Sequence, residues 1–161
     1  FLDPRSKNLG ARLIINLEKL YLSLKKLELK IANVEDYYRH SHELGISQID
    51  NQNLQNKIFG IECNFEELNG IDFKKGCYVG QENTTRIKLK EKLNNRLFAI
   101  KVLEGKINSE EIILEDKEIG KLLINNQNPF ALIKFKNNKF NFDDIYKCEN
   151  AIIKVQKPEW L

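Results

Sequence analysis

The fold class of the C-terminal part of this chain is decided by the stretch Ile112-Ile113-Leu114-Glu115-Asp116-Lys117-Glu118-Ile119-Gly120-Lys121-Leu122-Leu123-Ile124. Two apolar runs flank the short polar turn Glu115–Glu118, which is the pattern of a β-hairpin. Further strands are predicted at Arg96–Leu103, Phe130–Phe135 and Ala151–Val155. Short strands separated by polar turns predict a small antiparallel β-barrel or sandwich over residues 95–161.

Residues 1–92 have a different, mainly helical pattern. Asn16 is a candidate N-cap for a helix whose apolar residues recur at helical spacing, namely Leu17, Leu20, Tyr21, Leu24 and Leu27. Asn33 is expected to begin a second helix that ends at Gly45. Arg12–Ile15 is a candidate strand, Phe65–Leu68 a candidate helical turn, and a polar helix is expected to run to about Leu89. The fold class is therefore α+β, with a boundary near residues 92–95.

The composition excludes several classes of protein. The chain has 161 residues, of which 42% are hydrophobic and 30% charged, so it is not wholly disordered. No apolar run reaches the ~20 residues of a transmembrane helix. Lys and Arg number 26 against 23 acidic residues, far from the dense basic face of a dedicated nucleic-acid binder. The densest basic stretch, from Arg86 to Arg96, indicates either a solvated helix face or a site for an anion such as RNA or a polyglutamate tail.

The chain contains no methionine and begins at Phe1. We therefore expect it to be the C-terminal part of a longer protein. A targeting signal or catalytic group upstream would then lie outside this sequence.

The three cysteines, Cys63, Cys77 and Cys148, include no CxxC pair and are too few for a disulfide scaffold. Their odd number fits free thiols in a reducing compartment, and a self-contained zinc or iron–sulfur site, which needs about four ligands, is not expected. His40 and His42 do not share a helix face, so no joint metal site is expected there either. Cys63 and Cys148 are expected to pack in the interior.

Cys77 lies between Gly76 and Gly80, after two lysines and near the start of a predicted helix. Such surroundings lower a thiol pKa and favour the thiolate, which can be a nucleophile, a sulfur carrier or a metal ligand. The alternative is a small buried residue in a glycine-rich turn. The spacing alone leaves both interpretations open.

Cys77 belongs to the sequence Lys75-Gly76-Cys77-Tyr78-Val79-Gly80-Gln81-Glu82, which is followed by Thr84-Thr85-Arg86. This sequence resembles the signature of the YgfZ/GcvT-like folate-binding family. Further segments resemble other motifs of that family: Asp3-Pro4-Arg5, Glu43-Leu44-Gly45-Ile46, Glu62-Cys63-Asn64, Leu68-Asn69-Gly70-Ile71 and Pro158-Glu159-Trp160-Leu161. The resemblance extends over essentially the whole chain, and it is strongest to the branch of bacterial and mitochondrial iron–sulfur assembly factors.

The resemblance implies a GcvT-like aminomethyltransferase fold. Residues 1–92 would be the C-terminal portion of the folate-binding body, and residues 95–161 a small antiparallel β-barrel. It implies a protein that assists assembly or repair of 4Fe–4S proteins, binds tetrahydrofolate and has no classical turnover. Its partners would be A-type carrier-like assembly proteins and client apo-enzymes, not a membrane. Its location would be the bacterial cytoplasm, or the mitochondrial matrix in a eukaryote.

The resemblance also implies roles for individual residues. Cys77 becomes the functional thiol, supported by Lys75, Gln81, Glu82 and Arg86, and it would bind an iron–sulfur cluster only together with ligands from a partner. The implied folate-binding positions are Glu43, which matches a pterin-reading glutamate, with Glu62, Gly76, Tyr78 and Gly80.

The sequence departs from the family pattern at Ser41, where an arginine is common, and at Ser47 and Gly60, where prolines are usual. Two alternative functions stay open. One is a folate-dependent one-carbon (aminomethyl) transferase, and the other is a tRNA-modification-related protein.

Overall fold

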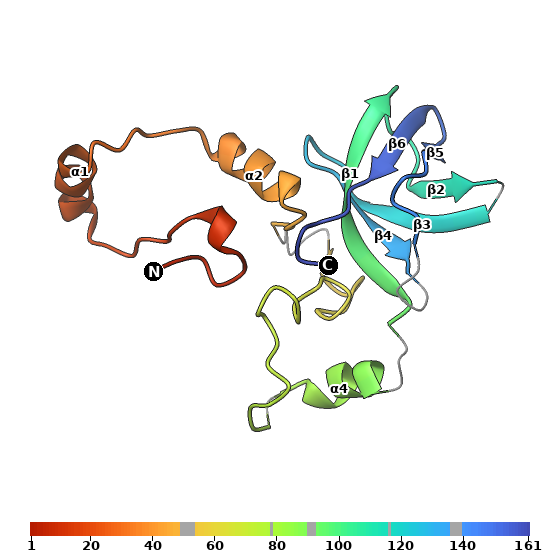
Figure 1. Ribbon diagram of the computed structural model, residues 1–161, viewed down its shortest axis with the longest axis horizontal. Coiled ribbons are helices and arrows are strands. Elements are labelled where there is room, and N and C mark those ends of the chain that lie inside the picture. Colours follow the sequence, from red (N-terminus) through yellow and green to blue (C-terminus); the bar gives the residue numbers. More distant parts are fainter. Residues whose placement is uncertain (49–53, 78, 90–92, 116, 136–139) are drawn as a thin grey trace.

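The computed structural model describes residues 1–48, 54–77, 79–89, 93–115, 117–135 and 140–161. Its C-terminal part is a closed antiparallel barrel with strand order β1-β4-β3-β2-β5-β6 (Figure 1). The strands are β1 (Asn95–Glu104), β2 (Glu111–Leu114), β3 (Lys117–Ile124), β4 (Phe130–Lys134), β5 (Tyr146–Cys148) and β6 (Ala151–Val155). The barrel, and not the sandwich, is therefore the architecture. The strands predicted within residues 95–161 are confirmed, and only the short β5 was not predicted there.

Side chains that point inward from all parts of the barrel form its core. Phe98, Ile112, Tyr146 and Ile153 are fully buried there, and Phe135 is nearly so. The rings of Phe140 and Phe142, which precede β5, pack edge to face with centroids 5.0 Å apart and extend this aromatic core. Burial of this many large apolar side chains is the main stabilising contribution to the barrel.

Strand β1 is buried on both faces over residues 96–100. Leu97 and Ala99 point away from the barrel interior and pack with Leu54 and Cys63 in a second hydrophobic cluster. The Leu97 N–H donates to the carbonyl of Glu62 at 2.9 Å. Residues 54–70 therefore cover the outer wall of the barrel. They do so mainly as a series of turns. The predicted single helical turn at Phe65–Leu68 is one of them, and the Leu68 N–H donates to the carbonyl of Asn64 at 3.0 Å.

Helices α1 and α2 begin where asparagine side chains supply the missing hydrogen bonds. In α1 (Leu17–Lys26) and α2 (Val34–Glu43), the side chains of Asn16 and Asn33 accept from backbone N–H groups, at 2.8 and 3.3 Å. Gly45, with φ +69°, ends α2 in the left-handed conformation. These ends, and α4 (Gln81–Leu89), confirm the prediction. The structure also has one short 3₁₀ helix, η1 (Lys7–Leu9), and no helix among its described residues is long and apolar enough to cross a membrane.

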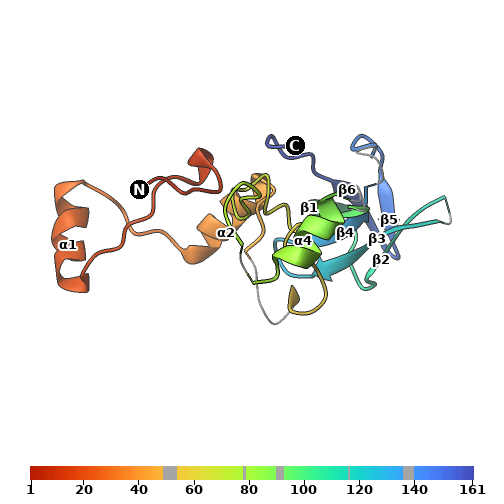
Figure 2. The same ribbon diagram turned by 90° about the horizontal axis from the view of Figure 1, so that it is seen from below.

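Residues 11–33 form an arm that extends away from the barrel and carries α1 at its far end (Figures 1 and 2). None of its residues is buried. Its exposed apolar side chains include Ile14, Leu17, Leu22 and Ile31. The predicted strand at Arg12–Ile15 is wrong, because the only pairing described near it is an isolated bridge between Leu2 and Ala11.

The N-terminal segment and the C-terminal tail both pack near α2. Asp3 is buried and forms ion pairs with Arg5 and Arg12, at 3.0 and 2.6 Å. Its hydrogen bonds with Arg5, and then with Arg12, hold the pKa of this carboxyl well below its usual range. Arg5 also donates to the Tyr37 hydroxyl at 2.7 Å. The Asp-Pro-Arg motif thus fixes the N-terminal segment to α2.

The indole N–H of Trp160 donates to the carbonyl of Leu44 at 3.0 Å, at the C-terminal end of α2. A Cβ added at Gly45 would lie 2.8 Å from the Cβ of Pro158. The Gly-Ile and Pro-x-Trp-Leu motifs therefore pack against each other.

His42 joins α2 to the barrel. It is buried, its ring meets Phe130 edge to face with centroids 5.1 Å apart, and its Nε2 lies 3.0 Å from the carbonyl oxygen of Pro129. This short contact is satisfied when Nε2 carries the proton and donates. Burial lowers the pKa of His42 below its ordinary value.

We expect the chain to lose stability as the pH falls below about 6.5, the ordinary pKa of histidine. The unfolded chain then binds a proton on His42 that the folded chain resists, and this difference favours unfolding. Urea midpoints at pH 7.5 and pH 5.5 measure the effect. The low pKa of Asp3 contributes only in more acidic solution, so the decrease should be smaller in His42→Gln. An equal decrease in that variant would show that another group titrates.

Candidate functional site

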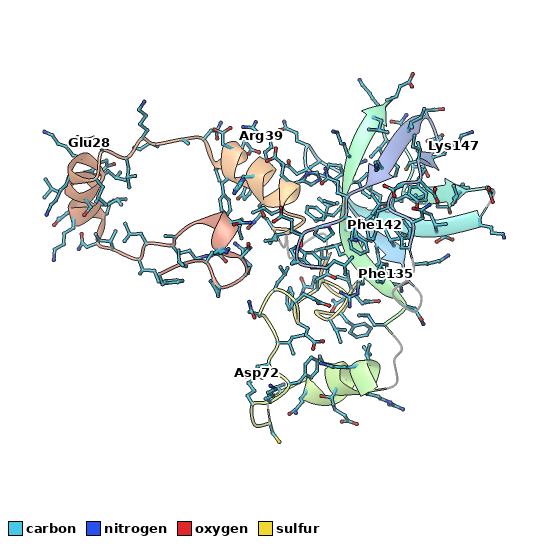
Figure 3. The ribbon with its side chains drawn as sticks, in the orientation of Figure 1. Glu28, Arg39, Asp72, Phe135, Phe142 and Lys147 are labelled. Carbon is cyan, nitrogen blue, oxygen red and sulfur yellow. The ribbon has the colours of Figure 1, made fainter. Side chains whose placement is uncertain are left out.

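Cys77 lies in an exposed loop that precedes α4. Figure 3 shows the loop near Asp72, far from Lys147 on the barrel. Cys63 and Cys148 are buried, as expected, so Cys77 is the accessible thiol of the three. The alternative of a small buried residue in a glycine-rich turn is therefore wrong for Cys77. Its exposure lets the thiol reach a second molecule.

Contacts join α4, which follows the loop, to the residues before the loop. Lys88 of α4 forms an ion pair with Glu66, and its Nζ lies 4.0 Å from the centre of the Phe73 ring. Before the loop, the carboxylate of Asp72 accepts from the Lys74 N–H at 2.8 Å in a local turn. The loop with Cys77 therefore connects two segments that contact each other.

The two glycines of the motif have different structural roles. Gly80 has φ +84°, a conformation that side chains disfavour, so the turn into α4 requires glycine there. Gly76 has no such φ, and a Cβ at this position would meet no described atom within 4 Å. Packing among the described residues therefore gives no reason for glycine beside Cys77.

The other residues of the motif belong to the same loop and helix. Lys75, Glu82 and Arg86 are exposed, and Gln81 is partly exposed at the first position of α4. Lys75 and Gln81 each interact with other groups of the chain. Tyr78 lies outside the described residues. The predicted thiol and its predicted supporting residues therefore form one accessible unit.

Glu43 lies at the edge of the barrel and not in the Cys77 loop. It is the last residue of α2 and lines a cleft of about 550 Å³ at the edge of the barrel. The cleft is otherwise lined by Lys101, Phe140, Asn141, Phe142, Asp143, Lys154, Val155, Gln156 and Lys157. No described residue of the Cys77 loop is among them. The predicted thiol site and the predicted pterin-reading carboxylate are thus separate sites among the described residues.

Gln156 gives this cleft a second acceptor. Its Oε1 is buried and has no hydrogen-bond partner among the described atoms. A buried amide oxygen without a partner carries a desolvation cost that a ligand N–H group would relieve. Glu43 and Gln156 together offer acceptors for the N–H groups of a heterocycle.

Glu62 has two partners within the chain. One carboxylate oxygen accepts from the Phe59 N–H at 3.0 Å, and the other from the Asn95 side chain at 3.4 Å. The neighbouring Cys63 packs against β1, and burial raises the pKa of its thiol to about 11. The Glu-Cys-Asn motif thus makes the contact between residues 54–70 and the barrel.

The two histidines point to different partners. His40 lies 2.7 Å from the carbonyl oxygen of Asn8, and His42 contacts that of Pro129. Within the described part of the chain, no group of three or more metal-binding side chains is close enough to hold an ion.

Sequence reasoning did not identify the lysines and Gln156 of the cleft. One signal was available: Lys101 interrupts the apolar run Leu97–Leu103 of β1, and Lys154 interrupts the apolar strand β6.

These features define an α+β protein in which an antiparallel barrel supports a separate, exposed cysteine loop. The chain is similar to two proteins named iron–sulfur cluster assembly factor IBA57, mitochondrial. It is 33% identical over 117 residues to the Dictyostelium discoideum homolog, covering 71% of this chain and 28% of that protein. It is 31% identical over 103 residues to the Mus musculus protein, covering 64% and 28%.

The chain is also 38% identical over 88 residues to the tRNA-modifying protein YgfZ of Buchnera aphidicola subsp. Baizongia pistaciae, covering 52% of this chain and 26% of that protein. No protein-family model matches the chain. The chain spans about a quarter of the length of these curated relatives. These homologues, named IBA57 and YgfZ, support the resemblance of the sequence to the family of YgfZ and IBA57 proteins.

Proposed function

We propose that this chain is part of a YgfZ- and IBA57-type protein that assists assembly or repair of iron–sulfur proteins, with Cys77 as the functional thiol. The observation that carries the proposal is the exposed Cys77 in a motif loop of a chain whose relatives are named iron–sulfur cluster assembly factors. The loop is exposed and leads into α4, so its thiol is accessible to a second protein.

The chemistry follows from the number of ligands. A 4Fe–4S cluster is held by about four thiolates, and Cys77 supplies one. The cluster is therefore cargo that Cys77 would bind only together with cysteines of an A-type carrier-like protein or a client apo-enzyme. The open space beside Gly76 would admit the backbone of that partner. Lys75, Gln81, Glu82 and Arg86 would form the polar rim around the shared cluster.

Tetrahydrofolate is the proposed small-molecule ligand. The residues of the cleft fit a pterin, because the exposed Glu43 carboxylate and the unpartnered Gln156 Oε1 are both acceptors for its N–H groups. When bound, tetrahydrofolate supplies a carrier of one-carbon units that can also be oxidised. Gly76, Gly80 and Glu62 stay weaker candidates, since none of them lines this cleft, and the candidate Tyr78 lies outside the described residues.

The proposed location follows the relatives. Those named IBA57 are mitochondrial, and YgfZ is bacterial. We therefore propose the mitochondrial matrix for a eukaryotic source and the cytoplasm for a bacterial one.

The test is complementation in cells that lack the gene, with aconitase activity under oxidative stress as the readout. We expect the parent protein to restore aconitase, and Cys77→Ser to fail although it accumulates to the same level, because serine cannot provide a thiolate. Val79→Ala changes an exposed residue of the same loop and is expected to complement. Full activity of Cys77→Ser would disprove the role of the thiol.

A role in tRNA modification is the second candidate, favoured by the name of the YgfZ relative. Binding through phosphates requires free cations and weakens steeply with salt. In the basic stretch, however, Lys88 pairs with Glu66, and Arg96 is buried and pairs with Glu67 at 2.5 Å. Lys90 and Lys92 lie outside the described residues. Tight, salt-sensitive binding of tRNA to the purified chain would favour this second candidate.

A further inference from the structure

The cleft at Glu43 has more positive than negative charge. Lys101, Lys154 and Lys157 line it, against Glu43 and Asp143. Only Lys154 has an acidic partner among the described residues, and the distance from its Nζ to Asp143 Oδ1 is long, at 4.0 Å. The lysines therefore remain available to an anionic ligand.

The barrel places two of these lysines directly opposite each other. Lys101 on β1 and Lys154 on β6 are cross-strand partners in the antiparallel register. Like charges in that position destabilise a sheet. An anion bound between them would relieve this repulsion. The lysine pair does not stabilise the barrel, but it can bind a negatively charged group.

The residues that line the cleft are also mixed in character. Phe140 and Phe142 form an apolar wall beside the lysines, and Phe142 is labelled near the centre of Figure 3. Glu43 and Gln156 provide acceptors. The cleft therefore offers hydrogen-bond acceptors, an apolar wall and lysines. A ligand that matches all three has N–H groups, an aromatic segment and several negative charges in one molecule.

We propose that Lys101, Lys154 and Lys157 bind the glutamate tail of a polyglutamylated folate, so that this cleft selects folates by the length of their tail. The proposal rests on the proposed folate binding and specifies its ligand. The carboxylates of the tail supply the negative charges, and the aminobenzoyl ring the aromatic segment. Lys101 and Lys157 are exposed and Lys154 is partly exposed. Each contact is therefore weak alone, and several carboxylates are needed for a measurable gain.

The test measures binding of the tail and of the pterin separately, by isothermal titration with the purified chain. The probes are p-aminobenzoyl-pentaglutamate, p-aminobenzoyl-monoglutamate and tetrahydrofolate monoglutamate. At low salt we expect the pentaglutamate to bind about tenfold tighter than the shorter tail, the sum of a few exposed ion pairs. Added salt should reduce this preference, since it screens exposed charges.

The variants are Lys101→Gln alone and Lys101→Gln combined with Lys154→Gln, with circular dichroism to confirm folding. We expect the single variant to reduce the preference for the long tail and the double variant to abolish it. The control is Lys147→Gln, which changes an exposed lysine on β5 that does not line the cleft and should keep the preference.

Equal binding of both tails by the parent chain, or an unchanged preference in the folded double variant, would overturn the proposal. The pterin assignment is tested by the monoglutamate of tetrahydrofolate, whose binding should be lost in Glu43→Gln. If that folate does not bind while the tail preference is present, the pterin assignment fails and the lysine site stands.

Discussion

Replacing Gly105 with alanine is expected to lower the free energy of unfolding by about 3 kcal/mol or more. Gly105 has φ +79°, and an alanine in the left-handed region costs about 1–2 kcal/mol. The added Cβ would also overlap the backbone carbonyl oxygen of Asn150 and lie 3.1 Å from the Cα of Ala151. Backbone atoms cannot move aside as a flexible side chain can, so the pairing of β1 with β6 would be disturbed. Urea denaturation of both proteins measures the difference.

The same substitution at Gly76 is the matched control. There the added Cβ meets no described atom within 4 Å and φ is not positive. We expect a stability change within about 0.5 kcal/mol, as at an ordinary surface position. If the space beside Cys77 admits a partner, Gly76→Ala will still reduce complementation. Equal stability of Gly105→Ala and the parent would refute the described approach of β1 to β6.

Replacing Asn64 with alanine is expected to lower the free energy of unfolding by about 2–4 kcal/mol. Asn64 is buried, its Nδ2 donates to the carbonyl of Leu97 at 2.8 Å, and its Oδ1 accepts from Arg96 at 3.4 Å. Alanine would leave this buried carbonyl of β1 without its side-chain donor. It would also have to adopt φ +62°, which asparagine tolerates better.

Asn64→Gly separates the two causes. Glycine removes the same hydrogen bonds but adopts the positive φ without strain. We therefore expect it to be less destabilised than Asn64→Ala by about 1 kcal/mol. Urea midpoints of the three proteins at one pH provide the comparison. If both variants lose the same stability, the left-handed conformation contributes nothing, and if neither loses any, residues 54–70 do not depend on this contact.

The elements that could be predicted are those whose signals are local. Asn16 and Asn33 mark helix starts because a side-chain oxygen can satisfy free N–H groups there, whatever the rest of the chain does. The hairpin around Glu115–Glu118 has its own turn chemistry. Arg12–Ile15 misled because β-branched residues favour a strand only when a partner strand is present. β5 was missed because three residues, Tyr146–Cys148, are too few for a pattern.

The site was predictable in part for the same reason. The motif around Cys77 identified a loop and a helix, but whether the thiol faces solvent depends on residues 66–73, which anchor α4 from elsewhere in the sequence. Likewise, β1 does not show the alternation of buried and exposed residues that marks a strand with one covered face. Its residues 96–100 are all buried because Leu54 and Cys63 cover the outer wall of the barrel. The lysine cleft required knowledge of which strands pair, since Lys101 and Lys154 become neighbours only when β1 meets β6.

The contacts between the two ends of the chain also constrain the order in which the protein forms. Trp160 meets Leu44 across 116 residues of sequence, and Glu159 meets Asn8 across 151. Contacts this distant in sequence carry a large loop-closure cost until the intervening barrel has formed. During synthesis on the ribosome, Trp160 is made after all six strands. The Leu44 carbonyl at the end of α2 therefore has no indole N–H to accept from until the barrel has been translated. We expect the N-terminal segment to reach its final contacts after the barrel has formed, although it is translated before the barrel.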